Sequence, residues 1–274
     1  MPHTDLSSRT ASTAACSTPE PPPGGLCAIH QPNLFPRLST LAKLFAADCW
    51  IVLDDAQFTR RDYQHRTRLA ALDDPAHRWW LSIPSQLPNG RNTTVREVVM
   101  AEPARSRQRT ARILQQHYGS SPHWPALRQA LAPVLDVFAT SDRTAAVAEA
   151  STRALLDLLG WRGRILHSSS LPARPGRSQR LADLAAAVGA RTYLCGSGGM
   201  SYLDAAPFTA NGIAVAPFTV PATGVWETAR EISSIWPLMR TGPQHLVSSL
   251  QTIHSRRRTR QPLDPHRDLA DWEQ

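Results

Sequence analysis

The chain has 274 residues, of which 42% are hydrophobic and 19% are charged, and its formal net charge at pH 7 is +8. Arginine carries nearly all of the positive charge, because Lys43 is the single lysine. No basic run is interleaved with aromatic residues in the way a nucleic-acid groove would be, so the sequence does not favour a nucleic-acid partner. No apolar run approaches the ~18 residues of a membrane span and no leader pattern is present, so we expect a cytoplasmic protein.

Composition divides the chain into three parts. Residues 1–24 are rich in Ser, Thr, Ala and Pro and are expected to form a disordered N-terminal tail. Residues 255–274 are charged, lack an apolar period and are expected to be a second tail. Residues 25–254 are enough for one sizeable core and are expected to fold as one domain. The four cysteines have no CxxC spacing, which argues against a zinc or redox site.

A strand, a helix and a second strand open the predicted domain. The apolar run at 26–29 predicts a strand that ends before Pro32, because the residue before a proline favours an extended or turn conformation. Apolar residues at helical spacing predict a helix over 38–45, and the run at 50–53 predicts a second buried strand. A unit of this length predicts a parallel, right-handed crossover.

The remaining chain continues to alternate strands and helices. Residues 58–72 are densely basic and offer few core positions, so we expect them to face solvent. Helical patterns predict a helical insertion around 104–160, broken at Pro122 and at Pro133. The further predicted elements are strands at 79–83, 95–100, 165–168, 191–194 and 214–218 and a helix at 178–188. This order predicts an α/β fold whose sheet is mainly parallel and has helices on both faces.

Polar residues follow the first two predicted strands, at the edge where an open parallel sheet binds ligands. His30 ends the first strand, and Asp54 and Asp55 end the second. Because both strands belong to one crossover unit, we expect these side chains to lie close together. A carboxylate would fix the tautomer of His30 and raise its pKa, which would prepare it as a general base. The alternatives are a structural histidine, an Asx turn or helix cap, and an acid pair that holds Mg²⁺.

A glycine-rich turn follows a later strand. Its glycines permit positive φ, so the amides of Ser197, Gly198 and Gly199 could form an anion-binding nest, with a plain tight turn as the alternative. Cys195 is a candidate nucleophile, although a nucleophilic cysteine needs a lowered pKa and a neighbouring base. Apart from the acid pair, the sequence indicates no metal ligand.

Basic and amide side chains near these strand ends are expected to bind substrate. The arginines could clamp a phosphate or a carboxylate, and the loop at 168–180 could act as a lid. The expected binding residues in this region are Gln31, Asn33, Arg60, Arg61, Tyr63, Gln64, His65, Arg66 and Arg68.

These segments together resemble the WbqC-like protein family over about residues 26–240. The resemblance rests on HQPN at 30–33, the FP that follows it, LDD-x-QF at 53–58 and the basic-aromatic stretch after it, and on a small-residue turn that follows GA-x-x-YL. It adds Gln57 and Tyr202 to the expected binding residues.

The chain departs from the family pattern at several positions. Arg37 and Ser39 replace the Trp and Gly expected after FP, and His65 stands where Asn is usual. Cys195 stands where Ser is common, which argues against a cysteine as the nucleophile of the family.

The resemblance implies a tailoring enzyme, because family members are found mainly in gene sets for surface polysaccharides and secondary metabolites. We expect a transferase that forms an amide by moving an acyl or aminoacyl group from a carrier-protein thioester, or a similar activated donor, to a small-molecule amine. His30 would deprotonate the amine, one of the two acids would orient it, and the glycine turn would stabilise an oxyanion or hold a phosphate. The arginines would steer a phosphopantetheine arm, and no other cofactor is expected.

Two other functions remain open. One is a nucleotidyl-type transferase that uses a nucleoside triphosphate and Mg²⁺, although no second histidine follows His30 at the spacing that this chemistry favours. The other is a non-catalytic accessory protein that binds a ligand or a carrier and would tolerate the loss of His30.

Overall fold

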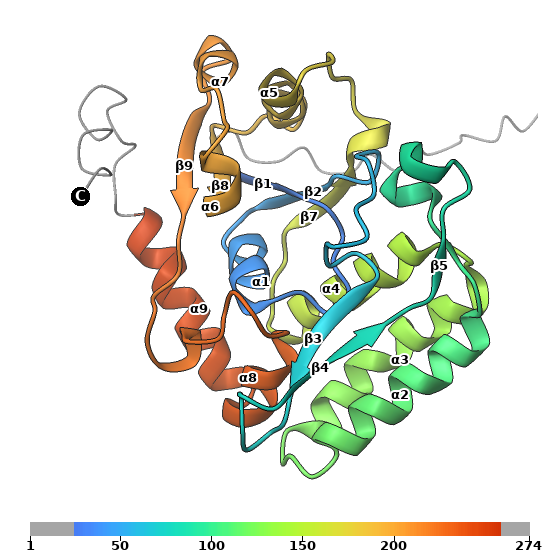
Figure 1. Cartoon of the computed structure of the whole chain (residues 1–274). Helices are drawn as coiled ribbons and strands as arrows, with labels where there is room; N and C mark the ends of the chain where they lie inside the picture. Colours follow the sequence, from blue (N-terminus) through green and yellow to red (C-terminus); the bar gives the residue numbers. More distant parts are fainter. Residues whose placement is uncertain (1–24, 259–274) are drawn as a thin grey trace, which may run out of the picture.

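The computed structural model describes residues 25–258, so both the predicted N-terminal tail and residues 259–274 of the predicted C-terminal tail lie outside the described residues. Its centre is a five-stranded sheet in the order β7-β2-β1-β8-β9 (Figure 1). Each neighbouring pair in this sheet is parallel. The strands are β1 (Leu26–His30), β2 (Cys49–Val52), β7 (Arg164–His167), β8 (Thr192–Gly196) and β9 (Ala214–Phe218). The predicted parallel α/β fold is confirmed.

Helices cover both faces of this sheet, as the sequence predicts (Figure 1). Side chains alternate across a strand, so Ala28 and Cys27 belong to different apolar clusters on opposite faces. One face packs against α1 (Leu38–Phe45), α4 (Thr144–Leu158), α8 (Ile235–Thr241) and α9 (Pro243–Arg258). The other face packs against α5 (Arg177–Ala187) and α7 (Ala206–Ala210).

The basic stretch differs from its prediction. Part of it is strand β3 (Arg66–Ala70), which pairs antiparallel with β4 (Arg78–Ser82) in a sheet of its own. Thr67 and Leu69 are fully buried between arginines that are not, so the alternation of a half-buried strand was hidden by the high charge. The expectation that this stretch has few core positions is therefore wrong for β3.

The helical insertion consists of α2 (Pro103–Tyr118) and α3 (Trp124–Thr140), and continues into α4. The predicted break at Pro122 separates α2 from α3, whereas the predicted break at Pro133 is wrong because α3 runs through it. Pro133 is exposed, so water can satisfy the carbonyl that has lost its donor. The other short elements are β5 (Ser85–Gln86), β6 (Val99–Met100), α6 (Ser197–Met200) and 3-10 turns at Gly90–Asn92, Val95–Glu97, Ser168–Ser170 and Gly224–Trp226. Within the described part of the chain, no helix has the length and apolar character needed to span a bilayer.

Tyr118 ties the helical insertion to β3. Its buried hydroxyl donates to the carbonyl of Ala70 over 2.9 Å and accepts from the Ala70 amide at 3.4 Å. Tyr118→Phe leaves these backbone groups without a partner, so we expect the free energy of unfolding to fall by about 1–2 kcal/mol. Urea unfolding of both proteins measures this difference, and a value indistinguishable from zero would contradict the proposed tie.

Candidate functional site

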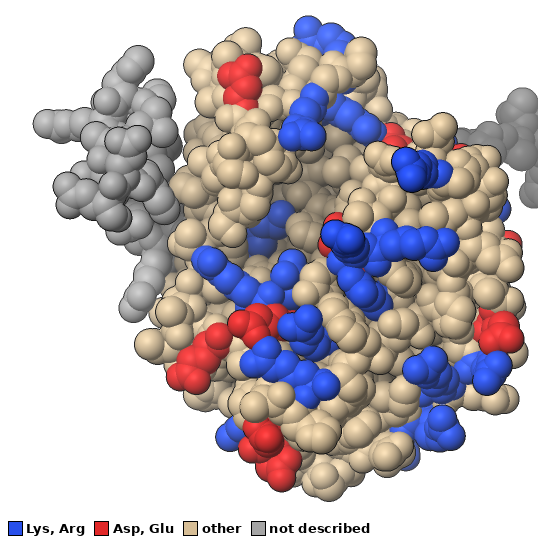
Figure 2. All heavy atoms as spheres, viewed as in Figure 1, with Lys and Arg blue, Asp and Glu red and all other residues tan. Residues whose placement is uncertain are grey.

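A cavity of about 650 Å³ opens at the carboxyl ends of β1, β8 and β9. Figure 2 shows it as a hollow with basic side chains around it. Five of the residues that line it are basic and one is acidic, so the cavity attracts anions. The charged lining residues are Arg37, Lys43, Arg177, Arg180, Arg230 and the acid Asp62.

His30 lines this cavity at the end of β1. Its backbone carbonyl accepts hydrogen bonds from the Leu53 amide at 3.0 Å and from the Trp50 indole at 3.1 Å, which join it to the neighbouring strand β2. Its ring Nδ1 lies 2.8 Å from the carbonyl oxygen of Gln31. Because a carbonyl can only accept, Nδ1 carries the hydrogen and Nε2 keeps its lone pair.

The surroundings of His30 favour its neutral form. Burial, followed by the nearby charges of Lys43 and Arg37, lowers the pKa of His30 to about 3. The expectation that a carboxylate would fix the tautomer and raise the pKa is therefore wrong. A backbone carbonyl fixes the tautomer, and cations rather than anions surround the ring.

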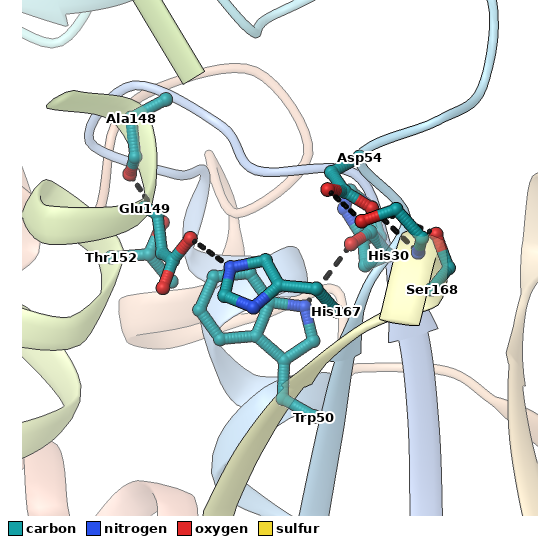
Figure 3. A network of polar contacts seen from close by, with 9 residues as sticks. His30, Trp50, Asp54, Ala148, Glu149, Thr152, His167 and Ser168 are labelled. Atoms are coloured by element: carbon teal, nitrogen blue, oxygen red, sulfur yellow. Dashed lines mark hydrogen bonds and ion pairs between the residues drawn. The ribbon is translucent and has the colours of Figure 1, made fainter. Parts of the chain in front are cut away.

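Asp54 links the ends of β2 and β7 (Figure 3). Its buried carboxylate accepts from the Ser168 hydroxyl at 3.0 Å, the Ser169 amide at 3.0 Å and the Ser169 hydroxyl at 2.7 Å. Beside this link, the Nε2 atom of His167 lies 2.8 Å from a carboxylate oxygen of Glu149. Asp54 therefore holds the sheet edge together rather than orienting His30.

Asp55 has a different pair of partners. It accepts a hydrogen bond from the Ser168 hydroxyl and forms an ion pair with Arg180 of α5. Among the hydrogen bonds found for residues 25–258, none joins His30 to either acid. The backbones of His30 and of the two acids do lie at the same edge of the sheet, as expected, but their side chains do not bond to one another. Asp55 instead contacts the cavity residue Arg180.

The glycine turn forms one wall of the cavity, where Ser197, Gly198 and Gly199 begin the short helix α6. A Cβ atom on Gly199 would lie 2.6 Å from the sulfur of Cys195, so this position needs glycine. Cys195 is fully buried, and this burial raises the pKa of its thiol. The thiolate is disfavoured there, so the structure argues against Cys195 as a nucleophile.

The expected binding residues divide into two groups. Gln31, the glycine turn and Tyr202 line the cavity. Gln64 donates to the side chain of Gln31 and, at 3.2 Å, to Asp62, so it supports the cavity from behind. The expected residues that do not line the cavity are Asn33, Gln57, Arg60, Arg61, Tyr63, Gln64, His65, Arg66 and Arg68.

Several of these outer residues have clear structural roles. Arg66 and Arg68 stack on the Trp80 ring, with guanidinium-to-ring distances of 4.4 and 4.8 Å. Gln57 donates to the carbonyl of Arg91 at 2.6 Å, and burial lowers the pKa of His65 to about 4. These arginines of the basic stretch therefore pack on Trp80 of β4 and do not line the cavity.

Sequence reasoning missed the most buried cation of the cavity, Lys43, and also Arg230. Arg177 and Arg180 fall within the loop at 168–180, which the sequence predicted only as a lid. One signal was available for Lys43, because it is the only lysine of the sequence and stands between the apolar residues Ala42 and Leu44 of the predicted helix. Within the described residues, no group of three or more His, Cys, Asp and Glu side chains is arranged to hold a metal ion.

Comparison with known proteins gives a family and one distant relative. The model of the WbqC-like protein family matches residues 31–235. The uncharacterized protein Rv1507c of Mycobacterium tuberculosis (strain ATCC 25618 / H37Rv) is 23% identical over 209 residues, which cover 76% of this chain and 86% of the relative. No solved structure matches the chain.

Proposed function

This chain belongs to the WbqC-like protein family, and from the chemistry of its cavity we propose that it is a biosynthetic transferase that forms an amide. It would move an acyl or aminoacyl group from a carrier-bound thioester, or a similar activated donor, to a small-molecule amine. One observation carries the proposal: a neutral imidazole and five basic side chains line the same cavity.

His30 is the proposed general base. Its Nε2 atom accepts a proton from the amine as the amine nitrogen attacks the thioester carbonyl. The tetrahedral intermediate then collapses, the C–S bond breaks, and the proton leaves with the thiol. The carbonyl of Gln31 would stabilise the transient imidazolium through its hydrogen bond from Nδ1.

A pKa of about 3 makes free His30 a weak base, but an anionic ligand changes its surroundings. Two of the groups that lower this pKa are the cations Lys43 and Arg37. A bound phosphate or carboxylate would offset their charge and raise the pKa of His30. The base would therefore become stronger when the donor is bound.

The basic lining supports an anionic donor. Arg177 and Arg180 project from α5, and Arg180 is held by Asp55. Guanidinium groups bind phosphate through paired hydrogen bonds, and the phosphate of a phosphopantetheine arm is a ligand of this kind. A nucleoside triphosphate would also suit these charges, but neither Asp54 nor Asp55 lines the cavity to hold its Mg²⁺. Both oxygens of Asp54 and Oδ1 of Asp55 are engaged by serines and an arginine.

The proposal predicts that the protein accelerates aminolysis of an acyl-phosphopantetheine thioester by small amines. His30→Gln is expected to reduce this rate roughly 100-fold, because it removes the base but keeps a polar side chain of similar size. Binding of free phosphopantetheine, measured by calorimetry, should change little. Liquid chromatography with mass detection of the amide measures the rate.

Two outcomes would contradict amide transfer. Strong thermal stabilisation by ATP or CTP with Mg²⁺, without aminolysis of any thioester, would favour the nucleotidyl reaction. Phosphopantetheine binding with no amide formed, and full pathway output from His30→Gln, would favour an accessory binding protein.

A further inference from the structure

Lys43, the single lysine of the chain, lies in the wall of the cavity. It projects from α1, which packs on the sheet, and only 6% of its surface is exposed. Lysine is rarely buried to this degree unless its charge is paired. The proposed transfer uses Lys43 only as one of five lining cations, which does not explain why this one is buried.

Lys43 has no carboxylate partner among residues 25–258. Its Nζ atom donates to the carbonyl of Ile29 at 3.2 Å. None of the ion pairs formed by the described side chains includes it. The only acid that lines the cavity, Asp62, already accepts from the Tyr63 amide at 2.9 Å and from Gln64 at 3.2 Å.

A buried ammonium without a counter-ion is costly, so a larger share of Lys43 is uncharged near neutral pH than of a free lysine. Burial lowers the pKa of Lys43 to about 8. The groups of the surrounding elements that bear on its charge are Cys27 and His30 on β1, Cys195 on β8, Arg37 beside α1, and Arg177 and Arg180 on α5. Cys195 and Cys27 act in the opposite direction to burial and raise the pKa of Lys43.

The amine also has room for a reaction partner. Its Nζ atom lies 4.0 Å from where a Cβ atom on Gly196 would be, so the absence of a side chain there leaves space beside it. We propose that Lys43 is an amine nucleophile that forms an imine with an aldehyde or ketone bearing a phosphate or carboxylate group. This capacity of the cavity does not depend on amide transfer being its reaction.

The proposed step is balanced without a co-reactant. The lone pair of the Lys43 amine attacks the carbonyl carbon and gives a carbinolamine. The carbinolamine loses its hydroxyl group together with a proton from nitrogen, so the products are the imine and one water molecule. The anionic group of the same compound would lie against the arginines, of which Arg180 is held in place by Asp55.

Pyridoxal 5′-phosphate serves as the probe, because it is an aldehyde with a phosphate group, and borohydride reduces its imine to a stable amine. The whole chain is incubated with the probe and treated with borohydride, and its intact mass is then measured by mass spectrometry. We expect one adduct per chain. After trypsin, the adduct blocks cleavage at Lys43, so residues 38–60 are recovered as one labelled peptide instead of two fragments.

Three measurements distinguish a specific anion-binding site around Lys43 from a lysine that is merely accessible to the probe. Inorganic pyrophosphate should protect Lys43 from the probe, and pyridoxal without its phosphate should react at least about tenfold more slowly. The labelling rate should rise about tenfold per pH unit below pH 8 and level off above it, because only the uncharged amine reacts. A free lysine would keep rising toward pH 10.

Lys43→Arg is the matched variant, because it keeps the positive charge and removes the nucleophile. It should lose the adduct while still binding pyrophosphate, which also checks that it is folded. The proposal is overturned if wild-type protein is labelled only at its N-terminal amine, if Lys43→Arg is labelled equally, or if pyrophosphate gives no protection. The aminolysis assay is separate, so failure of the imine would leave amide transfer standing, and the reverse also holds.

Discussion

Asp54→Ala is expected to lower the free energy of unfolding by about 3–5 kcal/mol, which corresponds to a fall in melting temperature of roughly 10 °C. The carboxylate is 7% exposed and accepts three hydrogen bonds, two from Ser169 and one from Ser168. Its removal deprives the Ser169 amide and the Ser169 hydroxyl of their acceptor, while Ser168 keeps Asp55. Hydrogen bonds to a charged group are each worth about 1.5–3 kcal/mol, so the loss of two accounts for the expected change.

The same change should also disturb the cavity. Ser168 bridges Asp54 to Asp55, and Asp55 holds Arg180. Without Asp54 the segment of Ser168 and Ser169 is no longer anchored to the end of β2. Asp55 and Arg180 are then less well fixed, so pyrophosphate binding should weaken along with stability.

Chemical unfolding and calorimetry measure these two effects. Asp73→Ala is the control, because this acid is exposed and its loss should change the free energy of unfolding by less than about 0.5 kcal/mol. If Asp54→Ala were as stable as Asp73→Ala, the hydrogen bonds at the end of β7 would not hold the edge, and this account of Asp54 would fail.

The position of the site could be predicted from local sequence. His30 and the acid pair end two strands of one crossover unit, so the parallel register brings their backbones together, as the pairing of His30 with Val52 confirms. The roles of the acids could not be predicted. Their partners, Ser168 and Arg180, come from more than 110 residues later in the chain, and only the packing of β7 and α5 brings them there.

The basic residues that line the cavity could not be predicted either, because they too come from distant parts of the chain. Two arginines of the basic stretch, Arg66 and Arg68 on β3, cover an aromatic ring, whereas the cations of the cavity come from distant segments. Arginine side chains can either stack on an aromatic ring or reach a ligand, and sequence density does not distinguish these uses. Lys43 and Arg230 are 187 positions apart in the sequence and line the same cavity only because the chain folds.

Arg180→Glu is expected to weaken pyrophosphate binding roughly 100- to 1000-fold, by loss of one charge-assisted contact and gain of a repulsive charge. Arg180 is the lining cation whose position is set by an ion pair, with Asp55, and a glutamate there would face that same carboxylate. The variant therefore replaces the attraction between Arg180 and Asp55 by repulsion between two carboxylates at the cavity wall.

Arg128→Glu is the control for this reversal, because Arg128 is an exposed residue of α3 and does not line the cavity. It changes the net charge of the chain by the same amount, so long-range attraction of the anion is weakened equally in both variants. Affinities measured by calorimetry at 0.15 M salt, where the Debye length is about 8 Å, should leave Arg128→Glu within a factor of about three of wild type. Equal loss in the two variants would mean that pyrophosphate responds to overall charge, and the cavity would then not be the anion site on which both the amide and the imine proposals depend.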